Sequence, residues 1–148
     1  MERETRREYP SSPVVGVAAM VFSEGRVLLV RRGNEPSYGR WGLPGGVVEL
    51  GETVMEAVVR EVEEETCVMA SPLRLITTFD SIVRDEEDRI RFHYVLCEFL
   101  CEYIGGELEA STDASEAVWA RLDELERMNV PSGTRRFIER VAREEGLL

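Results

Sequence analysis

The sequence contains few of the residues that bind zinc. It has one histidine, His93, and three cysteines, Cys67, Cys97 and Cys101. Structural zinc sites use four histidine or cysteine ligands. Cys97 and Cys101 fall in a stretch that reads as a core strand, so zinc is not the expected metal. His93 is expected to be an ordinary strand residue rather than a catalytic base. Three cysteines suit a reducing compartment and a cytoplasmic location.

Positive charge and long apolar runs are also scarce. The chain has no lysine. It has 18 basic and 29 acidic residues, which gives a formal net charge of −11. Nucleic-acid binding needs a basic footprint, so a nucleic-acid partner is not expected. No apolar run reaches the length that spans a membrane, and no stretch resembles a signal peptide, so no membrane association is expected. The 148 residues predict a single domain at 13–148, preceded by an exposed N-terminal arm at 1–12.

Glutamate is abundant in one segment, and there its spacing is regular. Gly46 is followed after five residues by Glu52, and after seven more by residues 60–65, which read REVEEE. Thr53 with Glu56 three residues later is a capping box, which predicts that a helix begins at residue 52 or 53. The second half of the pattern therefore lies on a helix, where residues three and four apart share one side.

The glutamates of this helix divide by direction. At about 100° per residue, the apolar stripe is formed by Val54, Ala57, Val58 and Val62. Glu61 and Glu65 fall inside this stripe, and Glu64 lies on its flank. Glu56 and Glu63 fall on the opposite face, where solvated charge is ordinary. Carboxylates that turn toward the protein body are costly unless paired or metal-bound. Because oxygen ligands select hard cations, Mg²⁺ is the first expectation and Mn²⁺ the second.

The rest of the sequence alternates between strand and helix patterns. Strands are expected at 14–22, 26–32, 73–84, 89–104 and 117–122, with a hairpin turn at 23–25. Further helices are expected at 123–128 and 132–145. The stretch 89–104 is apolar on both faces, which predicts a central strand. The alternation indicates an α/β layered domain.

The glutamate pattern resembles the signature of the Nudix (MutT-type) hydrolases. The matching positions are Gly46, Glu52, Arg60, Glu61, Val62, Glu64, Glu65 and Val68. The similarity continues upstream through residues 41–46 and downstream to Trp119, and it covers about residues 14–125. The resemblance implies the Nudix fold, a mixed β-sheet sandwiched between α-helices (α/β/α).

One position departs from the family pattern, because Cys67 stands where the family has glycine. A residue that follows a helix commonly takes the left-handed conformation, which costs a side chain with a β-carbon about 1 kcal/mol. Either Cys67 accepts that conformation, or the helix continues toward Ala70, with Pro72 as its limit. The change removes no ligand, so the chemistry is expected to survive.

The resemblance also implies roles for individual residues. Family metal-binding positions fall on Glu61, Glu64 and Glu65, with contributions from Glu52 and Gly45. Arg60 is expected to orient the glutamates, and its alternative is a surface ion pair with Glu56 or Glu64. The catalytic group is therefore expected to be Glu61, Arg60 and Glu64. An additional acid in a later loop is expected at Asp113 or Glu116, although each is individually typical of ordinary loop charge.

The implied reaction is metal-dependent hydrolysis of the diphosphate of a small-molecule nucleoside diphosphate linked to a second group. An ADP-ribose-type nucleotide sugar is favoured, and a (d)NTP pyrophosphatase of the MutT type is the alternative. A non-catalytic nucleotide sensor is disfavoured because the glutamates of the pattern are all present. Arg31, Arg32 and Arg40 are expected to meet phosphate or ribose, and Trp41 either stacks on a base or belongs to the core. A homodimer is compatible with the sequence.

Overall fold

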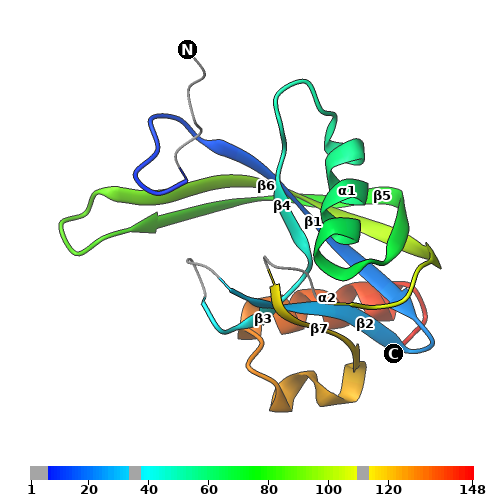
Figure 1. Cartoon of the computed structure of the whole chain (residues 1–148). Helices are drawn as coiled ribbons and strands as arrows, with labels where there is room; N and C mark the ends of the chain where they lie inside the picture. The colour runs from blue at the N-terminus through cyan, green and yellow to red at the C-terminus, as the bar shows by residue number, and fades with distance from the viewer. Residues whose placement is uncertain (1–6, 34–37, 110–113) are drawn as a thin grey trace.

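The computed structural model of the chain describes residues 7–33, 38–109 and 114–148. The strands within these ranges are β1 (Val14–Ser23), β2 (Arg26–Arg32), β3 (Trp41–Gly42), β4 (Gly45–Val47), β5 (Met69–Arg84), β6 (Ile90–Gly105) and β7 (Ala114–Arg121). The helices are α1 (Val54–Thr66), the 3₁₀ helix η1 (Leu122–Arg127) and α2 (Ser132–Glu144). Figure 1 shows the described strands between α1 on one side and α2 with η1 on the other.

The strands form one mixed sheet in the order β3-β2-β1-β6-β5, while β4 pairs with β1 and β7 with β2. β1 runs parallel to β6 from Val14 to Phe22 but changes partner on its other edge. Its first half pairs with β4, from Gly16 to Ala18, and its last two residues pair with β2. The sheet therefore forks at β1, and β2 and β3 diverge from the first half of that strand (Figure 1).

Two apolar cores lie on opposite faces of the sheet. Alternate residues of β1 point to opposite sides: Val17, Ala19 and Val21 pack with α1 residues, whereas Met20 packs with η1 and α2. Val58 and Val62 of α1 are fully buried, and burying such a side chain contributes about 1.5–3 kcal/mol. The predicted fold, a mixed sheet between helices, is confirmed.

The ends of α1 follow from local chemistry. The Thr53 hydroxyl accepts a hydrogen bond from the Glu56 amide at 3.1 Å, so the helix begins where the sequence predicts. At the other end Cys67 takes the left-handed conformation, with φ of 62°, and its amide donates to the Glu63 carbonyl. Of the two outcomes open for Cys67, the structure has the first. The helix therefore ends at Thr66.

The observed boundaries differ from the predicted ones at several elements, among them β5 and η1. β5 begins at Met69 rather than at residue 73 and runs through Pro72. Proline is tolerated there because β5 is the edge strand and its register shifts after Pro72, so no ladder hydrogen bond is needed from that nitrogen. The helix expected at 123–128 is the 3₁₀ helix η1, one residue earlier. The strand expected to be central, β6, lies between β1 and β5.

The predicted N-terminal arm is described from residue 7 onward. This part is largely exposed but is fixed to the hairpin that joins β5 and β6. The Tyr9 amide donates to the Arg91 carbonyl at 2.7 Å, and the Tyr9 hydroxyl donates to Asp85 at 2.9 Å. Glu8 pairs with Arg91 at 3.0 Å. Among the described residues, no helix is long and apolar enough to cross a membrane.

We predict that Cys67→Gly stabilises the protein by about 0.5–1 kcal/mol, because glycine takes a positive φ without the β-carbon penalty. Urea denaturation measures the change. Cys67→Ala is the control, since it removes the thiol and keeps the β-carbon. A gain of the same size in Cys67→Ala would show that the thiol, not the backbone, is responsible.

Candidate functional site

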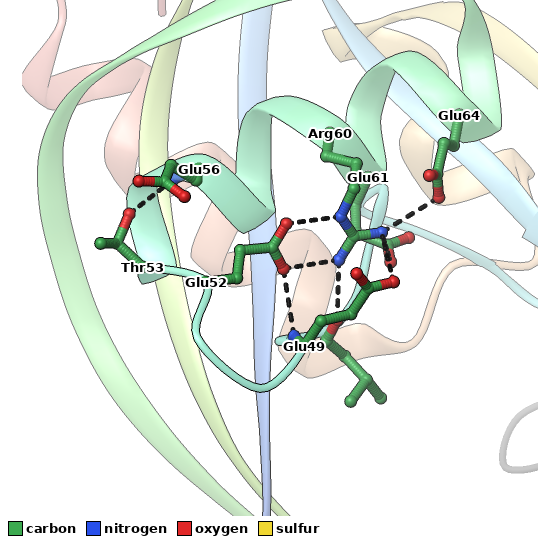
Figure 2. A network of polar contacts seen from close by, with 8 residues as sticks. Glu49, Glu52, Thr53, Glu56, Arg60, Glu61 and Glu64 are labelled. Carbon is green, nitrogen blue, oxygen red and sulfur yellow. Dashed lines mark hydrogen bonds and ion pairs between the residues drawn. The ribbon is translucent and has the colours of Figure 1, made fainter.

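Arg60 is the centre of a network of carboxylates (Figure 2). Its guanidinium binds both oxygens of Glu52, at 2.6 and 2.8 Å, and donates to Glu61 Oε1 at 2.7 Å. It also donates to Glu64 Oε2 at 3.1 Å and to the Val47 carbonyl at 3.0 Å. Arg60 thus holds three glutamates of the predicted pattern and ties them to β4. Its role exceeds a surface ion pair, because Glu52 and Glu61 side chains are only 13% exposed.

The glutamates of α1 point as their spacing predicts. Glu65 is buried, Glu61 is half-buried, and Glu64 is exposed on the flank. Glu56 and Glu63 are exposed. Glu65 accepts a hydrogen bond from the Gly45 amide at 3.3 Å. The Glu61 carboxylate lies so close to Gly46 that a β-carbon at this glycine would overlap it. The glycine pair of β4 therefore gives the carboxylates access to its backbone.

Burial and pairing act in opposite directions on these carboxylates. Burial raises the pKa of Glu61, and the hydrogen bond from Arg60 opposes that shift only in part. Glu52 has the contrary balance, because its bonds to Arg60 and to the Glu49 amide lower its pKa to about 2. Glu52 and Glu61 in turn raise the pKa of Arg60. Glu52 is therefore a fixed negative charge at neutral pH, paired with a permanent positive one.

The family that the glutamate pattern resembles generally uses divalent cations, and the donor set of this site fits one. Within residues 7–33, 38–109 and 114–148, no three histidine, cysteine, aspartate or glutamate side chains converge on one ion position. Glu61, Glu64 and Glu65 nevertheless supply carboxylate oxygens from a single helix, and such ligands suit hard cations. The single positive charge of Arg60 does not neutralise the combined negative charge of these three glutamates and Glu52. A cation would therefore have to replace contacts that Arg60 now makes.

A cleft of about 680 Å³ begins at Gly45 and Gly46 and extends along the fork of the sheet. Its lining comes from β1, the last residue of β2, β3, β4, β5, β6 and α2, with further residues from the N-terminal segment and the loops. Three of the residues predicted to meet substrate line it, namely Arg32, Arg40 and Trp41. The cleft therefore joins the glycines beside the glutamates to the predicted substrate-binding residues.

Arg31 is not among the lining residues. Its guanidinium pairs with Glu116 of β7 at 3.0 Å and also donates to the Gly39 carbonyl. Two residues predicted for separate roles thus bind each other. Asp113, the other predicted acid, lies outside the described residues.

Four lining residues carry chemistry that the sequence pattern did not single out: Arg7, Glu98, Phe137 and Arg140. Arg7 comes from the predicted arm, and its charge lowers the pKa of Glu61, although burial outweighs it. The Arg140 guanidinium lies over the Phe137 ring, 5.3 Å from its centroid. Only the tertiary fold brings these residues together, since they come from the N-terminal segment, β6 and α2.

The fold and the glutamate network define a class of protein. The sequence model of the NUDIX domain matches residues 12–141, so the chain belongs to the Nudix hydrolase family. An ADP-ribose pyrophosphatase of Methanocaldococcus jannaschii is 40% identical over 116 residues, which are 78% of this chain and 66% of that protein.

Solved structures agree with this assignment. A MutT NUDIX hydrolase from Burkholderia pseudomallei superimposes with a TM-score of 0.75 at 32% identity, over 88% of this chain and 99% of that one. The NUDIX domain of Shewanella oneidensis NrtR complexed with ADP ribose has a TM-score of 0.73 at 25% identity, over 91% and 89% of the two chains. Among the curated relatives, the chain spans 66% of one and 54% of another.

We predict that Arg60→Met lowers the free energy of unfolding by about 1–3 kcal/mol in EDTA, because the half-buried Glu61 loses its partner. Urea denaturation measures the change, and adding a divalent cation should narrow the difference from the parent protein.

Arg121→Met is the matched control. Arg121 binds Asp123 at 2.7 Å, but both side chains are more than half exposed, so its loss should cost less than about 0.5 kcal/mol. Equal costs for the two substitutions would contradict a structural role for the Arg60 network.

Proposed function

We propose that this protein is a metal-dependent hydrolase of the diphosphate in a nucleoside diphosphate linked to a second group, with an ADP-ribose-type nucleotide sugar as substrate. The observation that carries the proposal is the junction of the Arg60 network with the cleft at Gly45 and Gly46. Carboxylates for cations and a cleft for a nucleotide meet at one place. The 40% identical ADP-ribose pyrophosphatase supports the choice of substrate class.

Glu61, Glu64 and Glu65 would hold the cation, with Glu52 and the Gly45 backbone as further candidates. Mg²⁺ is the cation that best suits these oxygen ligands, and Mn²⁺ is the substitute. When bound, such cations neutralise the diphosphate and make water a stronger nucleophile. Arg60 positions Glu61 and Glu64 by hydrogen bonds of 2.7 and 3.1 Å. Gly45 fixes Glu65 from the opposite side through its amide.

The arginines of the cleft would bind the negatively charged substrate. Arg7, Arg32, Arg40 and Arg140 line it, in a protein whose formal net charge is −11. Arginine is suited to this role because its planar guanidinium binds phosphate oxygens in pairs. The concentration of positive charge in one cleft offsets the repulsion that an acidic surface would otherwise exert on a diphosphate.

A (d)NTP pyrophosphatase of the MutT type is the second candidate. The structural similarity to the Burkholderia pseudomallei MutT NUDIX hydrolase favours it. Both candidate functions need the same cations and the same arginines. They differ in the part of the substrate that occupies the cleft beyond its phosphates. A sensor without catalysis is the third candidate, and the complete set of pattern glutamates speaks against it.

We expect Mg²⁺-dependent turnover in a panel of ADP-ribose, NADH, dinucleoside polyphosphates and dNTPs, with ADP-ribose hydrolysed to AMP and ribose 5-phosphate. Chromatography of the products measures the preference. Stronger turnover of dNTPs than of ADP-ribose would favour the MutT-type alternative, and folded protein with no metal-dependent turnover of any member would refute the enzymatic proposal.

We predict that Glu64→Gln and Glu65→Gln each lower kcat by roughly 100-fold or more, because each removes one carboxylate charge from the cation site. Glu63→Gln is the control, since Glu63 is exposed on the opposite face of the same helix, and its activity should stay within twofold of the parent. Undiminished turnover in both test variants would overturn the assignment of the cation ligands.

A further inference from the structure

The described part of the N-terminal arm links the cleft with a distant part of the fold. Arg7 lines the cleft, and its positive charge acts on the Glu61 carboxyl. The other arginines of the cleft are placed by regular structure, since Arg32 ends β2, Arg140 lies in α2 and Arg40 directly precedes β3. Arg7 precedes β1 and belongs to no helix or strand. Its place in the cleft therefore depends on the contacts that hold the arm.

The arm is held by the end of the β5–β6 hairpin. β1 pairs with β6 only from Tyr94 onward, whereas β5 and β6 remain paired as far as Arg84 and Ile90. The hairpin therefore extends beyond the start of β1 (Figure 1). The arm lies beside this extension, because the Tyr9 amide donates to the Arg91 carbonyl at 2.7 Å.

Tyr9 makes the closest set of contacts between the arm and the hairpin. Besides its amide bond, its hydroxyl donates to Asp85 Oδ2 at 2.9 Å, and the Arg89 guanidinium lies over its ring, 5.2 Å from the centroid. Asp85 is itself fixed, since it accepts from the Arg89 amide at 2.9 Å and from the Arg89 side chain at 3.0 Å. The Asp85 side chain is only 13% exposed, so water screens these bonds less than at an open surface. The neighbouring Glu8 adds the ion pair with Arg91.

These contacts order the arm without adding to the core. None of residues 7–13 is buried, and an exposed ion pair such as Glu8 with Arg91 contributes little to stability. Tyr9 also has a positive φ of 50°, a conformation that is costly for a residue with a β-carbon and persists only where its surroundings fix it. Ordering a chain segment costs conformational entropy. The position of Arg7 is what this arrangement secures.

We infer that Tyr9 is a positioning residue, which holds the arm on the hairpin so that Arg7 binds a phosphate of the substrate beside the glutamates of α1. The ligand class is a nucleoside diphosphate, and the guanidinium supplies paired donors to its oxygens. This inference rests on the proposed function, because it assigns a residue that binds the phosphates at the same site.

The first test measures binding to Arg7. ADP carries the nucleoside diphosphate of the favoured substrate, and calorimetry in EDTA measures its affinity without hydrolysis. Arg7→Met should lower the affinity for ADP roughly tenfold or more and leave that for adenosine, which has no phosphate, unchanged. Arg7→Lys should recover part of the loss, because lysine keeps the charge but not the paired donors.

Arg74→Met is the matched control for the loss of one arginine. Arg74 pairs with Glu144 and Glu145 and does not line the cleft, so the affinity for ADP should stay within twofold of the parent. Equal affinity for ADP in Arg7→Met and the parent would overturn the inference, and so would an equal loss for ADP and adenosine.

The second test changes the anchor and leaves Arg7 in place. Tyr9→Phe removes only the hydroxyl and should lower the affinity for ADP about threefold, whereas Tyr9→Ala also removes the ring and should lower it by about five- to tenfold. Tyr103→Phe is the control, since the Tyr103 hydroxyl also donates one hydrogen bond, to the Gly106 carbonyl at 2.7 Å, and should change the affinity less than twofold. Parent affinity in Tyr9→Ala would overturn the role of Tyr9.

The double variant separates positioning from an independent effect of Tyr9. If Tyr9 acts through Arg7, adding Tyr9→Ala to Arg7→Met should cause no further loss of affinity for ADP. Losses that multiply in full would overturn the inference. Absence of ADP binding by the parent protein would also overturn it, whereas the proposed hydrolysis is decided separately by the substrate panel with Mg²⁺. Because binding is measured without metal, failure of the hydrolysis assays leaves both binding tests intact.

Discussion

The hydrogen bonds of Arg60 are the interaction on which the site depends. One guanidinium joins the helix α1 to Glu52 in the preceding loop and to the Val47 carbonyl at the end of β4. The loop between β4 and α1 is thereby held at both ends, by Arg60 and by the Thr53 cap. Carboxylates this close together repel one another unless a positive charge lies between them. Arg60 supplies that charge when no cation is present, which is why these glutamates can be gathered before any ligand arrives.

The fork of the sheet at β1 creates the cleft that lies beside the Arg60 network. If β2 had paired with β1 along its whole length, the edge now taken by β4 would be closed and the cleft would not form. The pairing of β4, rather than β2, with the first half of β1 depends on Gly45, because a β-carbon at this position would overlap the backbone of Val17. The glycine pair therefore has a structural role before it has a chemical one. It lets a short strand lie against β1 and brings the amide of Gly45 to Glu65.

What could be predicted from the sequence is what depends on neighbouring residues. Helical spacing correctly separated buried Glu65 and half-buried Glu61 from exposed Glu63. In a helix the position of a residue in the sequence determines the side of the helix on which its side chain lies. The Thr53 cap is local in the same sense. Cys67 left two outcomes open, since a cap depends on the energy of one dihedral angle. The pairing of Arg31 with Glu116 could not be predicted, because it joins residues 85 positions apart on β2 and β7. The strands β3 and β4 have two and three residues, too few to show a period.

Glu61 and Arg7 show why one pattern predicts the reaction better than the substrate. The charge of Arg7 acts on Glu61 in the structure, but Glu61 also has Arg60 fixed beside it in sequence and in space. The charge of Glu61 is therefore set within the helix that carries the family pattern. The place of Arg7 is set instead by contacts between the N-terminal arm and the β5–β6 hairpin. Residues that must hold a cation are constrained by one another at short range. A residue that reaches a cleft from an arm is constrained by a part of the chain far away in the sequence, and no local spacing carries a trace of that constraint.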